Sequence, residues 1–126
     1  MATLHLIVHR EDYALTRLPA GAPAPVFAGG RFASISRLGE ETTIVSERGF
    51  APGGEVQAGY RLIEIRGEFA LDSVGVVASV AGPLAAAGIG LFAFSVWSTD
   101  AFLVQGGDTA RAIETLHAAG HRVTEA

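Results

Sequence analysis

The chain has 126 residues and a formal net charge of −4 at pH 7, with 49% hydrophobic and 17% charged residues. This composition predicts a folded, well-cored protein of one medium domain or two very small ones. The basic residues are nine scattered arginines, which offer no basic face for nucleic acid. The absence of cysteine excludes disulfides, thiolate catalysis and cysteine-ligated metals.

The sequence predicts neither a signal peptide nor a membrane span. The N-terminus MATLHLIVHRED has no basic n-region, and its apolar stretch is too short. Residues 73–99 carry no charge over a length that could cross a membrane. However, glycines interrupt this segment, and its periodicity changes from helical to alternating at Gly88, whereas a spanning helix would keep one period. We therefore expect a cytoplasmic protein with no membrane partner.

Residues 1–60 predict a small β-rich module with no long amphipathic helix. A Pro/Gly/Ala-rich stretch over residues 19–30 leaves room for at most a short helix between residues 22 and 28, and residues 49–59 are expected to form a turn-rich connection. Strands are expected at Leu4–Val8, Tyr13–Leu18, Phe32–Leu38 and Thr42–Glu47.

A helix is expected near the start of the second half. Apolar residues recur every four positions from Val76 to Leu84, as on the buried stripe of a helix. Asp72 or Ser73 could cap its start, and Gly88 suits the position after its end. Pro83 lies inside the helix and removes one backbone hydrogen bond from it.

Residues 61–126 predict a complete module of class α+β. The expected strands are Arg61–Glu68, Leu91–Val96, Ala101–Gln105 and His121–Thr124. A second helix, capped by Asp108 and ended by Gly120, is expected to turn Ala112, Leu116 and Ala119 inward. The resulting order is β-α-β-β-α-β, the ferredoxin-like arrangement. The first sixty residues then form a reduced version of the same module.

Asp100 is the only charged residue from position 83 to position 104, and it lies at the expected hairpin tip over residues 97–100. Its carboxylate could bind a cationic group of a ligand, or it could accept backbone N–H groups of its own turn. Ser73 has a similar pair of roles, as a helix cap or beside a helix start that receives a ligand carboxylate. An α-amino acid would suit both positions at once.

The segment from Gly75 to Val104, with its PLAAAGI core and FSVWSTDAFLV hairpin, resembles ACT-domain proteins. More narrowly, it resembles the small bacterial tandem-ACT proteins related to the CASTOR-type arginine sensors. Their hairpin commonly reads I-S-T-Y-x-T-D, and the corresponding residues here are 94–100, with Val96 in place of the threonine. The first half resembles them more loosely, through YALTRLP, the Pro/Ala-rich segment and FASISRL.

The resemblance implies a non-catalytic regulatory protein that binds a small effector, an amino acid, at a module interface and needs no cofactor. In the sensor relatives, the ligand lies between the loop after the first strand and the hairpin. Matched by motif, these positions are Asp72, Ser73, Val74 and Gly75 in the loop and Thr99 and Asp100 at the tip.

Other kinds of site find little support in the sequence. The four histidines form no convergent set of three or four ligands, so no metal is expected. No G-x-S-x-G elbow and no glycine-rich phosphate loop followed by lysine occurs, so we assign no catalytic residue and expect no enzyme. Open edge strands favour a homodimer. The main alternative is a ligand-free structural or dimerisation module in which the hairpin forms the dimer seam, and a small enzyme using Asp100 and a histidine is the third.

Overall fold

The computed structural model describes residues 3–25 and 29–126, which belong to two compact units. Unit 1 consists of Met1–Arg10 and Arg61–Ala126, and unit 2 consists of Glu11–Tyr60. The predicted division into residues 1–60 and 61–126 therefore needs one correction. The first ten residues belong to the second module, because their strand pairs within its sheet.

Unit 1 has the predicted α+β, ferredoxin-like order, preceded by one extra strand. Its elements are β1 (His5–Val8), the second half of β5 (Glu55–Arg66), α1 (Val76–Ala86), β6 (Phe92–Ser95), β7 (Asp100–Gln105), the 3-10 turn η2 (Gly106–Asp108), α2 (Thr109–Ala118) and β8 (Arg122–Glu125). The strands lie in the order β8-β1-β5-β7-β6. The extra strand β1 pairs antiparallel with β5 and parallel with β8, and so separates these two strands.

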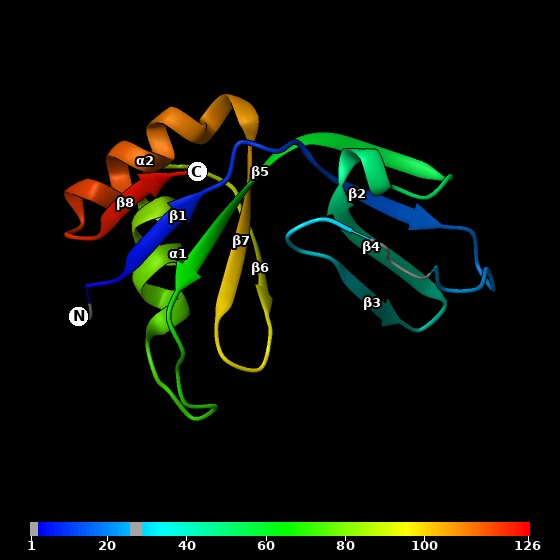
Figure 1. Cartoon of the computed structure of the whole chain (residues 1–126), viewed down its shortest axis with the longest axis horizontal. Helices are drawn as coiled ribbons and strands as arrows, with labels where there is room; N and C mark the ends of the chain where they lie inside the picture. Colours follow the sequence, from blue (N-terminus) through cyan, green and yellow to red (C-terminus); the bar gives the residue numbers. More distant parts are fainter. Residues whose placement is uncertain (1–2, 26–28) are drawn as a thin grey trace. The chain divides into compact units, whose positions relative to one another are not determined.

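The core of unit 1 lies between this sheet and the two helices, which lie side by side in Figure 1. Alternate strand residues contribute to it, as period-two patterns require. The fully buried members from the strands are Leu6, Val8, Ile63, Ile65, Phe102 and Val104, and those from the helices are Val80, Leu84, Ala112 and Leu116. Ala119 was predicted to face inward but is exposed, because α2 ends at Ala118 and the chain turns there.

Helix α1 begins later than expected from the predicted capping residues, Asp72 and Ser73. Its N-cap is Gly75, at a φ of 84°, and no side chain caps the helix, so the predicted capping by Asp72 or Ser73 is wrong. Glycine reaches this left-handed conformation without steric cost, and the helix starts directly after it. The predicted end is confirmed: Gly88 follows the C-cap with a φ of 74°, and the next residue, Ile89, donates its N–H to Leu84 O.

A buried histidine compensates for Pro83 inside α1. Pro83 has no N–H to donate to the carbonyl of Ser79, four residues earlier. His121 Nε2 lies 2.8 Å from that carbonyl oxygen, and the Leu4 N–H donates to His121 Nδ1 at 3.1 Å. These two bonds require the tautomer with the proton on Nε2. His121, only 3% exposed, thereby connects α1, the segment before β1 and the segment before β8.

Unit 2 is an antiparallel sheet in the order β3-β4-β2-β5. Its elements are β2 (Tyr13–Leu18), β3 (Ser34–Leu38), β4 (Glu41–Glu47), the 3-10 turn η1 (Arg48–Phe50) and the first half of β5. The expected turn-rich connection over residues 49–59 is wrong in its second part, where residues 55–59 extend β5 and pair with β2. Residues 22–25 form no helix, and the rest of the short helix considered there lies outside the described residues.

No helix of the described part of the chain is long and apolar enough to cross a membrane.

Candidate functional site

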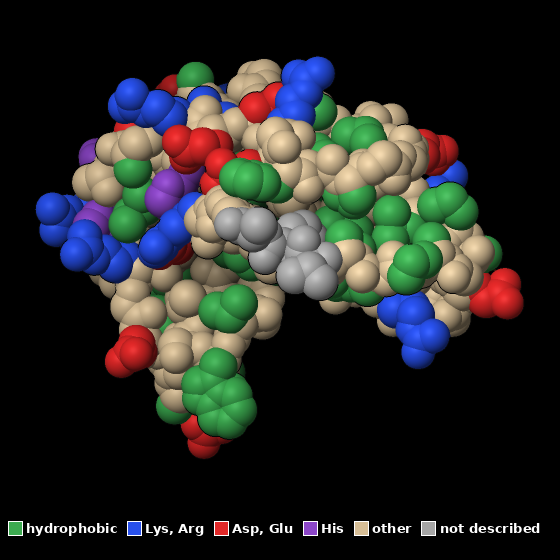
Figure 2. Space-filling view, turned by 45° about the vertical axis from the view of Figure 1, so that its right-hand side comes forward, with side chains coloured by type: hydrophobic (Ala, Val, Ile, Leu, Met, Phe, Trp, Pro, Cys, Tyr) green, Lys and Arg blue, Asp and Glu red, His purple; other side chains and the backbone are tan. Residues whose placement is uncertain are grey.

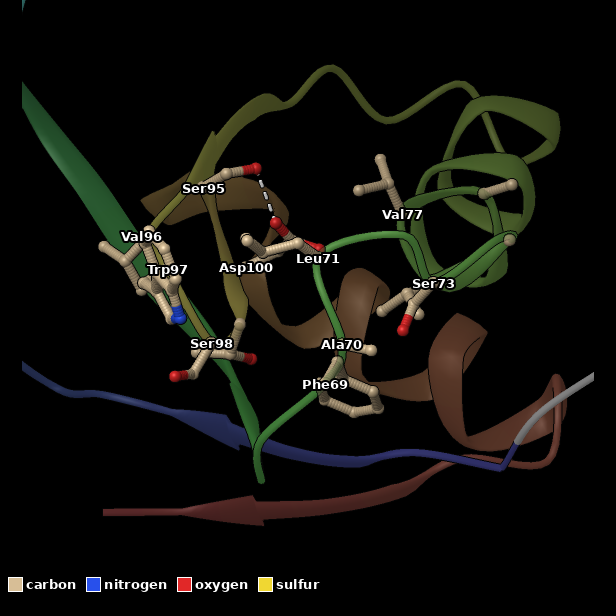
Figure 3. Close-up of a pocket in the computed structure, with 14 residues that line it drawn as sticks. Phe69, Ala70, Leu71, Ser73, Val77, Ser95, Val96, Trp97, Ser98 and Asp100 are labelled. Atoms are coloured by element: carbon tan, nitrogen blue, oxygen red, sulfur yellow. Dashed lines mark hydrogen bonds between the residues drawn. The ribbon is translucent and has the colours of Figure 1, made fainter.

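A pocket of about 340 Å³ lies within unit 1, between the segment that leads into α1 and the tip of the β6–β7 hairpin (Figure 3). This volume is at the lower end of the range for small-molecule sites, and it suits a single small metabolite. The lining residues come from two stretches only. They are Phe69, Ala70, Leu71, Ser73, Gly75, Val76, Val77 and Ala78 from the first, and Ser95, Val96, Trp97, Ser98, Thr99 and Asp100 from the second.

Asp100 supplies the only ionisable side chain among the residues that line the pocket. It begins β7 opposite Ser95 at the end of β6, and Ser95 Oγ donates a hydrogen bond of 2.5 Å to its Oδ1 atom. In Figure 3 the carboxylate points between the hairpin and the start of α1. No arginine or histidine of the described residues lies within ion-pair distance of it. Asp100 therefore offers an unneutralised negative charge to a cationic group.

The first turn of α1 lies across the pocket from Asp100. Val76, Val77 and Ala78 are its first three residues, and the N–H groups of a first helical turn have no acceptor within the helix. No side chain caps this end, and no acidic residue lies in its first turn. These N–H groups and the helix dipole favour an anion such as a carboxylate.

Short hydrogen bonds hold the hairpin tip to the end of β5. The Phe69 N–H donates to Ser98 O at 2.6 Å, and Thr99 Oγ1 donates to Ile65 O at 2.8 Å. The Val96 N–H closes the tip on Thr99 O at 2.9 Å. Thr99 thus lines the pocket, and its hydroxyl positions the hairpin tip because it donates to Ile65 O.

Apolar side chains form the remaining wall and stay largely in solvent. Trp97 is 79% exposed, Leu71 69% and Val96 55%, while Phe69 is partly buried beneath them. Large apolar groups that remain exposed around a polar centre are typical of binding sites. They would be covered by a ligand or by a second protein surface.

The structure brings four of the six predicted site residues together: Ser73, Gly75, Thr99 and Asp100 all line the pocket. Asp72 and Val74 do not line it; both are exposed, Val74 at 95%. Among the lining residues that the sequence did not single out, Ser95 could have been found from the hairpin register, which places it opposite Asp100. No signal in the sequence identified Phe69 or Leu71, because they reach the pocket only through the fold.

No group of three or more His, Asp or Glu side chains suited to a metal ion occurs in residues 3–25 and 29–126. His9 instead contacts Glu64, with Nε2 and Oε1 3.0 Å apart, and His5 Nε2 lies 3.0 Å from Thr124 Oγ1. His121 is engaged on both ring nitrogens as described above.

Comparison with known proteins decides the family. The sequence pattern of the ACT domain matches residues 55–118, about half of the chain. The chain belongs to the ACT-domain family. ACT domains are generally regulatory modules that bind small molecules, and the matched region contains the whole pocket. A separate comparison of the sequence with curated proteins gave no match.

Solved structures show how widely this ACT fold occurs. The protein Atu0741 of Agrobacterium tumefaciens is 32% identical, with a TM-score of 0.90 over 100% of this chain and 96% of that one. A Vibrio cholerae protein of unknown function, described as a possible transport protein, is 21% identical, with a TM-score of 0.67 over 94% and 91% of the two chains. The regulatory subunit of aspartate kinase from Thermus thermophilus, in a ligand-free form, is 12% identical, with a TM-score of 0.64 over 90% and 95%. The last two likenesses concern the fold alone.

Proposed function

We propose that this ACT protein is a non-catalytic sensor that binds a free α-amino acid in the pocket of unit 1. The observation that carries the proposal is the pairing of two unsatisfied features across one small pocket. Asp100 has no cationic partner among the described residues, and the first turn of α1 has no cap. The ammonium group of an amino acid would bind Asp100, and its carboxylate would bind the N–H groups of Val76–Ala78.

The pocket supports an amino acid with an uncharged, apolar side chain better than arginine. Arginine carries two cationic groups, and the lining residues provide one carboxylate. The wall that a side chain would meet consists of Phe69, Leu71, Val96 and Trp97. Val96 also replaces the threonine of the hairpin motif. We propose that the chain is related by descent to the CASTOR-type sensors. This relation does not require that the chain bind arginine.

The ligand would act by holding two parts of unit 1 together. The loop that leads into α1 and the hairpin tip are separate stretches of chain, and a bridging amino acid would stabilise the arrangement in which both reach it. A ligand shifts an equilibrium only through its different affinity for the two arrangements. The proposed output is a change in association with a protein partner.

We propose a homodimer formed along the β6 side of unit 1. Strand β6 pairs only with β7 among the described strands, so its other edge is open. Phe92 on β6 is 44% exposed, and Val77 on the neighbouring face of α1 is 38% exposed. Open edges and exposed apolar groups favour association with a second copy. Sedimentation velocity tests this proposal, which a strictly monomeric protein at 100 μM would overturn.

Two further parts of the proposal concern the chain as a whole. Unit 2, Glu11–Tyr60, would be a reduced ACT-like module, since it keeps a four-stranded sheet and has no α-helix in its described residues.

The protein would act in the cytoplasm, where free amino acids are available to it. Cell fractionation tests the location.

A thermal-shift screen against the twenty common amino acids tests the proposed function. Ligand that binds only the folded protein raises the unfolding temperature, by an amount that grows with the ratio of its concentration to Kd. The amino acid that gives the largest shift is then titrated against Asp100→Asn, which keeps the side-chain shape and removes the charge. Because charged hydrogen bonds contribute about 1.5–3 kcal/mol, affinity should fall by about 10- to 100-fold.

Asp72→Asn is the matched control, because Asp72 is exposed and lies outside the pocket. It makes the same charge change and should leave affinity within twofold. Equal losses in both variants would contradict the assigned role of Asp100. Absence of any shift, with an intact dimer in Asp100→Asn, would favour the ligand-free dimerisation module instead.

A further inference from the structure

Three basic side chains form a row across the sheet of unit 1. The register pairs His5 on β1 with Arg66 on β5 and with Arg122 on β8. Directly paired residues project from the same face of a sheet. The neighbours of His5 along β1, Leu4 and Leu6, belong to the core beneath the helices. The row therefore lies on the opposite face of the sheet, away from α1 and α2.

The side chains of the two arginines in this row have no partner among the described residues. Their guanidinium groups make no ion pair or hydrogen bond there, whereas those of Arg17, Arg48 and Arg111 each pair with a carboxylate. The two guanidinium groups repel each other across His5, and an anion bound between them would remove this repulsion. A chain with a net charge of −4 nevertheless leaves two exposed arginines on either side of a histidine. This cost points to an anion from outside the chain.

Glu64 is the acidic residue of β5 on the same face as the row. It lies two residues before Arg66, opposite Ile7, and its Oε1 atom contacts His9 Nε2 at 3.0 Å. The ring of His5 lies close to Thr124, with Nε2 and Oγ1 3.0 Å apart. Blue, purple and red side chains lie together on the left side of the space-filling view (Figure 2). The row adds two unpaired positive charges to the surface of an acidic protein.

The shape of the row indicates a macromolecular partner. Small ligands bind in concave sites that bury most of their surface, whereas the two arginines of this row are exposed on strands. Arg66 and Arg122 are separated by two strand spacings, about 10 Å. Each guanidinium can bind one carboxylate through two hydrogen bonds. Affinity for nucleic acid grows with the number of phosphates that basic side chains neutralise, and this row offers only two arginines for that purpose.

We propose that the row formed by Arg66, His5 and Arg122 docks an acidic segment of a partner protein, with one carboxylate on each arginine. The surface is on the β8 side of the sheet and the ligand pocket is beside the β6–β7 hairpin, so the proposal stands without the proposed function. It gives the protein a second binding surface with its own chemistry.

Fluorescence anisotropy with a labelled hexaglutamate peptide tests the proposal at 50 mM salt. The full chain should bind the peptide saturably, and Arg66→Gln/Arg122→Gln should lose about tenfold in affinity. The matched control is Arg17→Gln/Arg37→Gln, which makes the same change in net charge at exposed residues of unit 2. It should bind within twofold of the parent chain. All three proteins should unfold within 2 °C of one another, because the substitutions are on the surface.

Four outcomes would overturn the proposal. The first is no saturable binding of hexaglutamate, and the second is an equal loss of affinity in the two double variants, which would indicate general charge attraction. The third is tighter binding of a DNA duplex than of the peptide. The fourth is a dimer of the parent chain that only Arg66→Gln/Arg122→Gln dissociates, which would make a second copy the occupant.

Discussion

Replacing His121 with phenylalanine should destabilise the protein through two backbone groups. The side chain is 3% exposed, and its ring nitrogens satisfy the Leu4 N–H and the Ser79 carbonyl. Phenylalanine keeps an aromatic ring of similar size, so the cavity effect is small. The Ser79 carbonyl then has no substitute partner in the helix, because residue 83 is proline.

The expected loss follows from the number of groups left without partners. A buried donor or acceptor deprived of its hydrogen bond costs about 1–3 kcal/mol. Two such groups lower the free energy of unfolding by about 3 kcal/mol, a large part of the 5–15 kcal/mol typical of a domain. For a chain of this length, the unfolding temperature should fall by roughly 10 °C.

Urea unfolding followed by far-UV circular dichroism measures this loss, and Pro83→Ala provides the decisive comparison. Alanine at position 83 restores an N–H that can donate to Ser79 O, so His121→Phe should cost about 1.5 kcal/mol less in that background. A cost below 0.5 kcal/mol in the natural background would refute the reasoning. An equal cost in both backgrounds would show that His121 and Pro83 are not coupled through this carbonyl.

Two further predictions concern titration. Burial raises the pKa of Tyr13 from 10.0 to about 12, so the unfolded chain ionises first. The free energy of unfolding should therefore fall by about 2 kcal/mol as pH rises from 10 to 12. Urea unfolding across this range should show the fall and Tyr13→Phe should abolish it, whereas identical losses in both proteins would contradict the assignment. Burial, together with the positive charges of Arg122 and Arg66, holds the pKa of His5 below its ordinary value of 6.5. An NMR titration of the His5 ring should show this pKa rising in Arg66→Gln/Arg122→Gln, and an unchanged value would show that the arginines do not act on His5.

Much of the fold was predictable from local patterns. The strand-like composition of its segment predicted β2 with its observed bounds, Tyr13–Leu18, and the same kind of signal placed β4 within one residue. The four-residue apolar repeat predicted α1, and Gly88 ends it as expected. These features depend on neighbouring residues, so a single sequence contains them.

The errors arise where distant segments decide the structure. Residues 55–59 read as a turn because Gly53, Gly54 and Gly59 surround them, yet pairing with β2 makes them part of a long strand. The insertion of β1 between β5 and β8 has no local signal at all. The start of α1 was misplaced because Ser73 is a common capping residue, and the chain instead uses Gly75 in the left-handed conformation.

The polar residues of the candidate site were predictable from the sequence, but the apolar residues that form the wall of the pocket were not. Asp100 stood out because its charge is isolated in an apolar segment, and the structure places it in the pocket together with Ser73. Phe69 and Leu71 reach the pocket because the Phe69 N–H is bonded to the hairpin tip. Such a contact across the fold leaves no trace in spacing or composition.

Amide chemical-shift mapping during titration with each of the twenty amino acids, at up to 10 mM, tests the central claim most directly. At least one amino acid with an apolar side chain should shift amide signals in a saturable manner. The account predicts that these shifts are confined to residues 69–78 and 95–100 and are largest at Val76–Ala78, where the carboxylate binds. Shifts centred elsewhere in the chain, or none with any amino acid, would contradict it.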